Sequence, residues 1–187
     1  MISNRDELKT VLKHEKKLYL NNSLRGIKLL LIADQDYFVW KFMKCLRYME
    51  YHQNNNHTLR SAYWERKKNL LGAKLGLFIF PNCVDKGLRI WHYGDIIIHR
   101  NSIIGENCQL HGMNCIGNKG IADSGVPVIG NNVNIGVGAK IIGDIYIADN
   151  VCIGANAVVT ESCHVEGATL IGVPAKMIKK GNDDEII

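Results

Sequence analysis

The 187-residue sequence contains only three prolines and no long apolar segment. A membrane-spanning helix needs about 18 consecutive apolar residues, whereas the longest candidate, residues 27–33, is short and lies between charged residues. The N-terminus has neither the apolar stretch nor the small-residue cleavage site of a signal peptide. These absences predict a cytoplasmic protein without stable membrane insertion.

The six cysteines have neither the spacing of a metal site nor that of a disulfide framework. No CxxC pair occurs, and the sequence also lacks a Gly-rich phosphate-binding motif. Cys108 and Cys163 occupy a repeat position, described below, that requires small residues. We therefore expect buried thiols in a reducing compartment rather than disulfides.

Acidic residues are scarce in the first part of the chain. Residues 1–75 contain 15 Lys and Arg against 7 Asp and Glu, a net charge of +8, whereas residues 76–187 contain 8 against 11, a net charge of −3. A basic segment is compatible with binding to nucleic acid or to an anionic membrane. The aromatic residues there follow helical spacing rather than forming a stacking platform, which favours solvated helix surfaces and predicts no nucleic-acid partner.

The basic segment has the 3.6-residue periodicity of amphipathic helices. Helices are expected at about residues 5–20, 37–51 and 59–75, and with weaker support at 26–33. Asp34 and Asp36 suit a helix N-cap, and Gly76 suits a helix C-terminus. The polar residues 53–56 separate the last two helices.

From residue 98 the apolar period changes to six. A small or aliphatic residue follows four positions after each repeated aliphatic residue, and glycine frequently follows it directly. Agreement over twelve positions is a strong repeat signal. The twelve positions are Ile98, Ile104, Leu110, Ile116, Ile129, Ile135, Ile141, Ile147, Ile153, Val159, Val165 and Ile171.

A six-residue period predicts a parallel β-helix. Three six-residue edges form one triangular coil, the aliphatic residues fill the prism, and stacked coils bury a continuous core. The sequence thus predicts an α-helical domain at residues 1–76, a β-helix at residues 77–178 and a tail at residues 179–187. The repeat is interrupted between Ile116 and Ile129, which predicts a polar loop at residues 117–128, and such loops frequently carry binding sites.

Several segments resemble hexapeptide-repeat acyltransferases, in particular serine O-acetyltransferases and the related enzymes of surface-polysaccharide biosynthesis. The similarity lies in residues 87–94 (GLRIWHYG), in the interrupted coil, and in residues 171–176 (IGVPAK). It extends to the helical residues 40–51 and 74–82. The resemblance implies a left-handed β-helix, a homotrimer with active sites between neighbouring prisms, and acetyl-CoA as the acyl donor.

The resemblance also implies a catalytic residue, His92. Imidazole titrates near neutral pH and can accept the proton of an attacking hydroxyl. The oxyanion then needs N–H donors, which turn glycines are expected to supply. We assign substrate binding to Trp91, Tyr93 and His111, and CoA binding to Asn118, Lys119, Ala139, Ala157 and Lys176. For the two alanines, packing within the prism is the alternative.

The sequence departs from the serine enzymes at three acceptor-side positions. The aspartate about fifteen residues before the histidine is absent from residues 77–79, Trp91 replaces the aspartate directly before it, and Val126 replaces a second histidine before Pro127. These departures favour a sugar hydroxyl as acceptor, in surface-polysaccharide biosynthesis. The alternatives are serine O-acetylation in cysteine biosynthesis and a non-catalytic trimeric scaffold, and N-acetylation of an amino sugar also stays open.

The remaining histidines do not predict a metal site. His92, His99 and His111 lack the close pairing of metal-dependent hydrolases with this repeat. His99 is expected on an exposed strand and His164 in a surface turn. His14, His52 and His57 are expected to be solvated.

Overall fold

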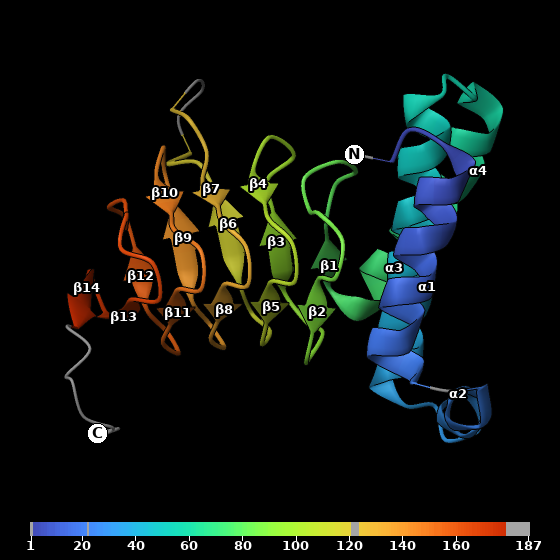
Figure 1. Ribbon diagram of the computed structural model, residues 1–187, viewed down its shortest axis with the longest axis horizontal. Helices are drawn as coiled ribbons and strands as arrows, with labels where there is room; N and C mark the ends of the chain where they lie inside the picture. Colours follow the sequence, from blue (N-terminus) through green and yellow to red (C-terminus); the bar gives the residue numbers. More distant parts are fainter. Residues whose placement is uncertain (1, 22, 121–123, 179–187) are drawn as a thin grey trace.

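The computed structural model describes residues 2–21, 23–120 and 124–178. Four helices gather at one end of a stack of short strands (Figure 1), and they confirm the four predicted helical segments. The helices are α1 (Arg5–Leu20), α2 (Ser23–Leu31), α3 (Gln35–Asn54) and α4 (Thr58–Leu75).

Side-chain and backbone caps explain where these helices begin and end. The Asn4 side chain accepts hydrogen bonds at the start of α1, and the Asp34 side chain accepts the Asp36 N–H at the start of α3. Gly76 ends α4 with φ of 64°, in the left-handed region that glycine adopts without steric cost. The predicted cap at Asp34 and stop at Gly76 are thereby confirmed.

The rest of the described chain forms three sheets that stack along a common axis. Their strand orders are β1-β3-β6-β9-β12, β10-β7-β4 and β14-β13-β11-β8-β5-β2, and all pairings are parallel except β13 with β14. The strands are β1 (Leu77–Phe78), β2 (Arg89–Ile90), β3 (Ile96–Ile98), β4 (Ile103–Ile104), β5 (Gln109–Leu110), β6 (Cys115–Gly117), β7 (Val128–Ile129), β8 (Asn134–Ile135), β9 (Lys140–Ile142), β10 (Tyr146–Ile147), β11 (Cys152–Ile153), β12 (Val158–Val159), β13 (Thr169–Gly172) and β14 (Ala175–Ile178).

The strand register confirms the repeat. Ile135 pairs with Ile153 and Ile141 pairs with Val159, so successive coils are eighteen residues apart, or three repeats of six. Ten of the twelve repeated aliphatic residues are buried, from Ile98 to Val159. Cys108 is also buried, as expected for the small-residue position, whereas the buried Cys163 pairs with Ile147 and so takes the place of a repeated aliphatic residue. Aliphatic side chains from all three sheets therefore form one continuous core.

The last two predicted core positions are wrong. Val165 is 52% exposed and Ile171 is 44% exposed, whereas the neighbouring Leu170 is buried. The reason is a shorter last coil: Ile147 pairs with Cys163 sixteen residues later and Ile153 pairs with Leu170 seventeen residues later, rather than eighteen. Because side chains alternate across a strand, this one-residue change moves Leu170 inward and Ile171 outward.

The interruption of the repeat is a loop added to one coil. Ile116 pairs with Ile141, twenty-five residues later, which is seven more than in a regular coil. The extra residues lie between β6 and β7 while the two strands keep their places in the stack. Residues 121–123 of the predicted loop lie outside the described residues.

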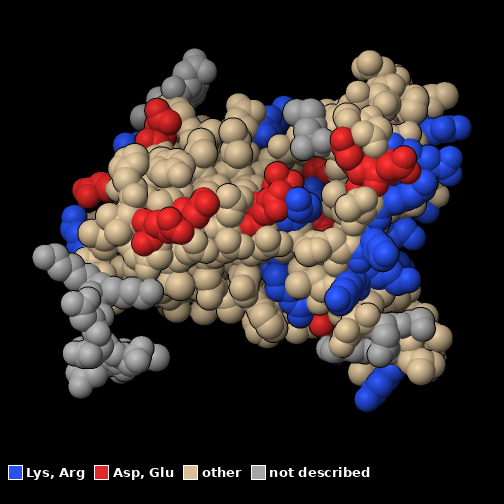
Figure 2. All heavy atoms as spheres, viewed as in Figure 1, with Lys and Arg blue, Asp and Glu red and all other residues tan. Residues whose placement is uncertain are grey.

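Charge is distributed unevenly over the molecule. On the face shown in Figure 2, most Lys and Arg side chains lie over the helical end. In the part of the chain that the structure describes, no helix is both long and apolar enough to cross a bilayer.

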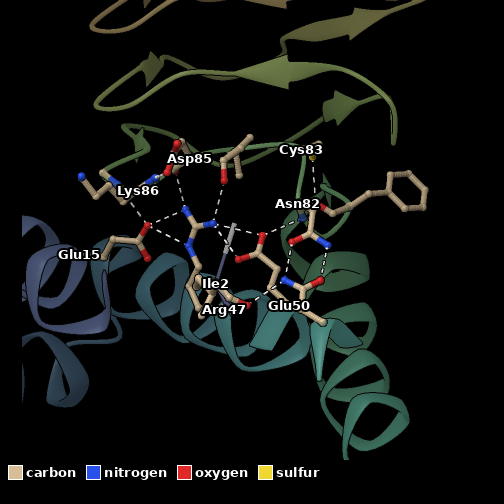
Figure 3. Close-up of polar contacts among 12 residues, drawn as sticks. Ile2, Glu15, Arg47, Glu50, Asn82, Cys83, Asp85 and Lys86 are labelled. Atoms are coloured by element: carbon tan, nitrogen blue, oxygen red, sulfur yellow. Dashed lines mark hydrogen bonds and ion pairs between the residues drawn. The ribbon is translucent and has the colours of Figure 1, made fainter. Parts of the chain in front are cut away.

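A buried ion cluster joins the helices to the first coil. The Arg47 guanidinium of α3 lies between Glu15 of α1 and Glu50 of α3 (Figure 3), with N–O distances of 2.7 Å and 2.9 Å. Arg47 also donates to the carbonyl oxygens of Val84 and Asp85 at 2.8 Å and 2.7 Å. Burial lowers the pKa of Arg47, but Glu50 and Glu15 outweigh it and raise this pKa above its ordinary value. The guanidinium thus stays charged and fixes the helices on the prism.

Candidate active site

His92 lies at a corner of the prism, in the turn after β2, and its side chain is exposed. Its Nδ1 is 3.3 Å from Oε1 of Gln35, the first residue of α3. In the neutral tautomer whose Nδ1–H donates to Gln35 Oε1, Nε2 keeps its lone pair. This is the tautomer that a general base needs.

An ion pair holds α3 against β2 and so brings Gln35 to His92. Asp36, the residue after Gln35, accepts a hydrogen bond from Arg89 of β2 at 2.8 Å. Both side chains are nearly buried, with 10% and 12% of their surface exposed. Arg89 also donates to the Leu18 carbonyl oxygen of α1 at 3.2 Å. The orientation of His92 is therefore coupled to the packing of the helical end.

Gln35 is a site residue that the sequence did not reveal. It lies 57 residues before His92, in a helix whose pattern shows only amphipathicity. The segment in which an aspartate was sought contains buried Leu77 and exposed Phe78. The partner of His92 is a neutral amide from another element.

Aromatic and amide side chains extend from Trp91 along the sheet that contains β2. Trp91 stacks on His111 with ring centroids 5.9 Å apart, and its Nε1 donates to Gln109 Oε1 at 2.8 Å. His111 Nε2 is 2.8 Å from Asn134 Oδ1. Three successive coils thus contribute to one polar surface beside His92. Tyr93 is also exposed, directly after His92.

Three glycines in turns of the prism use their N–H groups for hydrogen bonds inside the chain, and oxyanion binding by turn glycines stays a prediction. Gly112 donates its N–H to Asn114 Oδ1 at 3.0 Å, Gly136 to the Ile153 carbonyl and Gly154 to the Leu170 carbonyl, both at 2.8 Å. These N–H groups hold the coil and its neighbours together. Gly112 is also close to the site, because a Cβ there would lie 3.0 Å from the His92 carbonyl oxygen.

The chain does not bring the predicted loop residues to the corner of His92. Asn118 and Lys119 follow β6, in the sheet β1-β3-β6-β9-β12, whereas His92 follows β2 in another sheet. Asn118 Oδ1 accepts the Gly120 N–H at 3.1 Å. The exposed Lys119 extends over Gly143, where a Cβ would lie 2.9 Å from Lys119 Cε. The two groups therefore occupy different corners of one prism.

The other residues assigned to CoA lie in the core and at the last strand. Ala139 and Ala157 are fully buried, and their carbonyl oxygens accept the N–H groups of Cys115 at 3.3 Å and Lys140 at 2.8 Å. Packing therefore accounts for both alanines. Lys176 of β14 is exposed, with its Nζ 3.7 Å from Glu161. Contact of these residues with CoA stays a prediction.

One histidine expected to be solvated is buried. His52, near the end of α3, is only 8% exposed, and its Nδ1 is 3.1 Å from Nδ1 of His57. Its ring lies beside those of Tyr51 and His57, a surrounding that a helical period alone does not reveal. His99 is half-buried after β3, and its Nδ1 accepts the Asn101 N–H at 3.2 Å. Within residues 2–21, 23–120 and 124–178, no group of three or more His, Cys, Asp or Glu residues is placed to hold a metal ion.

Comparison with known proteins agrees with this architecture. Residues 127–161 match the family described as bacterial transferase hexapeptide (six repeats). The serine acetyltransferase of Helicobacter pylori strain J99 is 36% identical over 107 residues, which cover 56% of this chain and 62% of that protein. The chain therefore spans about three fifths of that relative. The serine acetyltransferase of Buchnera aphidicola is 28% identical over 201 residues, covering 94% and 76%.

A solved structure supports the fold over nearly the whole chain. The soybean serine acetyltransferase apoenzyme superposes with a TM-score of 0.76 at 20% identity, covering 93% of this chain and 70% of that one. This likeness includes both the helices and the stacked strands, because it covers more of the chain than either part alone.

These comparisons overturn the expectation of a sugar acceptor. The relatives are named serine acetyltransferases, and they give no support to surface-polysaccharide biosynthesis. The inference failed because it compared positions along the sequence. As Gln35 shows, a polar partner of His92 comes from a distant segment, so a missing residue at one position does not establish a missing group in space.

Proposed function

We propose that this chain is an acetyl-CoA-dependent serine O-acetyltransferase acting in cysteine biosynthesis. The 36% identity to the Helicobacter enzyme carries the proposal. The arrangement of His92 and Gln35 supports it, since an exposed imidazole with a protonated Nδ1 and a free Nε2 suits base catalysis.

In the proposed reaction, His92 Nε2 accepts the proton of the serine hydroxyl as the oxygen attacks the thioester carbonyl. Collapse of the tetrahedral intermediate breaks the carbon–sulfur bond. The imidazolium then returns the proton to the departing thiolate, giving O-acetylserine and CoA. Gln35 Oε1 holds Nδ1–H throughout, so the ring keeps its tautomer and its orientation.

The acceptor is proposed to bind beside His92, against Trp91, Tyr93 and His111. The stacked Trp91 and His111 rings are held by Gln109 and Asn134, which gives this surface a fixed shape. Fixed side chains lower the entropy cost of positioning a small substrate.

The active unit is proposed to be a homotrimer of left-handed β-helices. Separation of the two predicted half-sites supports this, because His92 and the Asn118–Lys119 pair lie at different corners of one prism. A neighbouring subunit would place its loop next to His92. In that arrangement Lys119 and Lys176 would meet the CoA phosphates, and Asn118 the pantetheine arm.

Release of CoA from acetyl-CoA in the presence of L-serine tests the function. We expect His92→Asn to lower the turnover rate by about 10²–10⁴-fold, the usual contribution of a general base. His164→Asn is the matched control, because His164 stacks on Tyr146 far along the chain from β2. Unchanged turnover in His92→Asn would remove the base assignment. A folded chain that fails to bind CoA in calorimetry would instead identify a non-catalytic scaffold.

A further inference from the structure

A groove between α3 and α4 gathers positive charge and aromatic rings. It has a volume of about 460 Å³, and its lining includes Lys41, Lys44, Lys67, Tyr37, Trp40 and Trp64. Tyr37 and Trp40 belong to the first turns of α3 and Trp64 to α4. Small-molecule sites typically have volumes of about 300–1,000 Å³, so the groove is large enough for an organic ligand.

Three lysines from two helices line the same groove. Lys41 and Lys44 are i, i+3 neighbours on α3, where like charges repel one another, and Lys67 comes from α4. Burial raises the pKa of the Cys45 thiol in the groove lining, and the charges of Lys67, Lys44 and Lys41 each oppose that rise.

No carboxylate neutralises this charge in the described part of the chain. None of the ion pairs between described residues includes these lysines, and the groove lining contains no acidic residue. Glu65, the acidic residue of α4, acts on Lys68 instead. The groove therefore carries three positive charges and has room for a counter-charge.

The rings of the groove define the rest of the ligand. Lys41 Nζ is 5.4 Å from the Tyr37 ring centroid and Lys67 Nζ is 5.3 Å from that of Trp64, so ammonium groups lie beside rings of the groove. Packing of the aliphatic lysine stems on apolar surface would account for the position of each lysine alone. It would not account for three lysines that line one groove without a carboxylate. A planar ring bearing phosphate groups matches both features, since the ring packs on the aromatic groups and the phosphates meet the ammonium groups.

We propose that the α3–α4 groove is a binding site for a nucleotide, separate from the candidate active site. The site stands independently of the proposed acetyltransferase activity, because it shares no residue with the surface around His92.

Tryptophan fluorescence tests the site. The chain contains three tryptophans, Trp40, Trp64 and Trp91. In a Trp91→Phe background, only the two groove tryptophans report binding. Titration with ATP is expected to change the emission, whereas inorganic tripolyphosphate is expected to bind more weakly because it lacks a ring.

The matched variants are Lys41→Gln/Lys67→Gln and the control Lys16→Gln/Lys17→Gln, which removes two exposed charges from α1. A hydrogen bond to a charged group contributes about 1.5–3 kcal/mol, so the groove variant is expected to weaken ATP binding at least about tenfold. The control is expected to bind as the parent does. An unchanged emission, equal losses in both variants, equal affinity for tripolyphosphate, or a groove variant that only changes the oligomer size would each overturn the proposal.

Discussion

Replacing Arg47 with methionine removes the centre of the buried cluster that joins the helices to the prism. The guanidinium makes six hydrogen bonds of 2.7–3.2 Å to Glu15, Glu50 and two backbone carbonyls. Methionine fills a similar volume but leaves two buried carboxylates without their counter-charge. Breaking a buried ion pair from one side costs about 3–5 kcal/mol. We therefore expect Arg47→Met to lower the free energy of unfolding by about 4 kcal/mol.

Urea denaturation followed by circular dichroism measures this loss, at one fixed chain concentration because any oligomer would couple to folding. The triple variant Glu15→Leu/Arg47→Met/Glu50→Leu is expected to recover about 2 kcal/mol, since it leaves no buried charge. Lys86→Met is the control: its ion pair with Glu106 is about two-fifths exposed and contributes less than about 1 kcal/mol. A loss below about 1 kcal/mol in Arg47→Met would refute the reasoning.

Three further outcomes follow from the site, the helix corner and the coil contacts. Gln35→Leu is expected to lower the turnover rate, because it removes the acceptor of the His92 Nδ1–H. Gln35→Glu is expected to keep the turnover rate but to move the acidic limb of its pH profile, because a carboxylate favours the imidazolium form of His92. Identical pH profiles for the parent chain and both variants would contradict a positioning role for Gln35. Burial, together with His57 and Arg60, lowers the pKa of His52, so the unfolded chain binds the proton more readily. Stability is then expected to fall as the pH drops below about 6.5, and His52→Gln should flatten that part of the urea-midpoint curve. Gly136→Ala is expected to cost about 1–3 kcal/mol, because its Cβ would lie 2.7 Å from the Ala155 backbone nitrogen, whereas Gly26→Ala meets only ordinary contacts and should not destabilise.

Most of the fold could be predicted from local sequence patterns. The helices were predictable because their apolar period and their end signals, Asp34 and Gly76, depend on nearby residues. The coils were predictable because every six-residue edge of the prism requires an aliphatic residue that points into the core. The prediction failed at Val165 and Ile171, where the last coil has fewer residues than three repeats and the register changes. A repeat read forward from Ile129 cannot detect such a deletion, since aliphatic residues lie on both sides of it.

The site was less predictable because its contacts join distant segments. His92 was found from its local motif, but Gln35 reaches it only because Arg89 and Asp36 hold α3 against β2. The same limit applies to His52, which is buried beside His57. The net charge of residues 1–75 indicated basic helices but not the groove. Whether three lysines line one groove depends on how α3 and α4 pack against each other.

The shortened final coil and the antiparallel β13–β14 hairpin also determine how copies of this chain can associate. A regular coil offers unpaired backbone groups to whatever lies next along the stacking axis, so identical prisms would add end to end into a filament. Here the helices occupy one end and β14 folds back on β13 at the other. The sheet that contains β13 therefore does not end on a parallel strand, which disfavours end-to-end addition of an identical prism there and favours association through other faces.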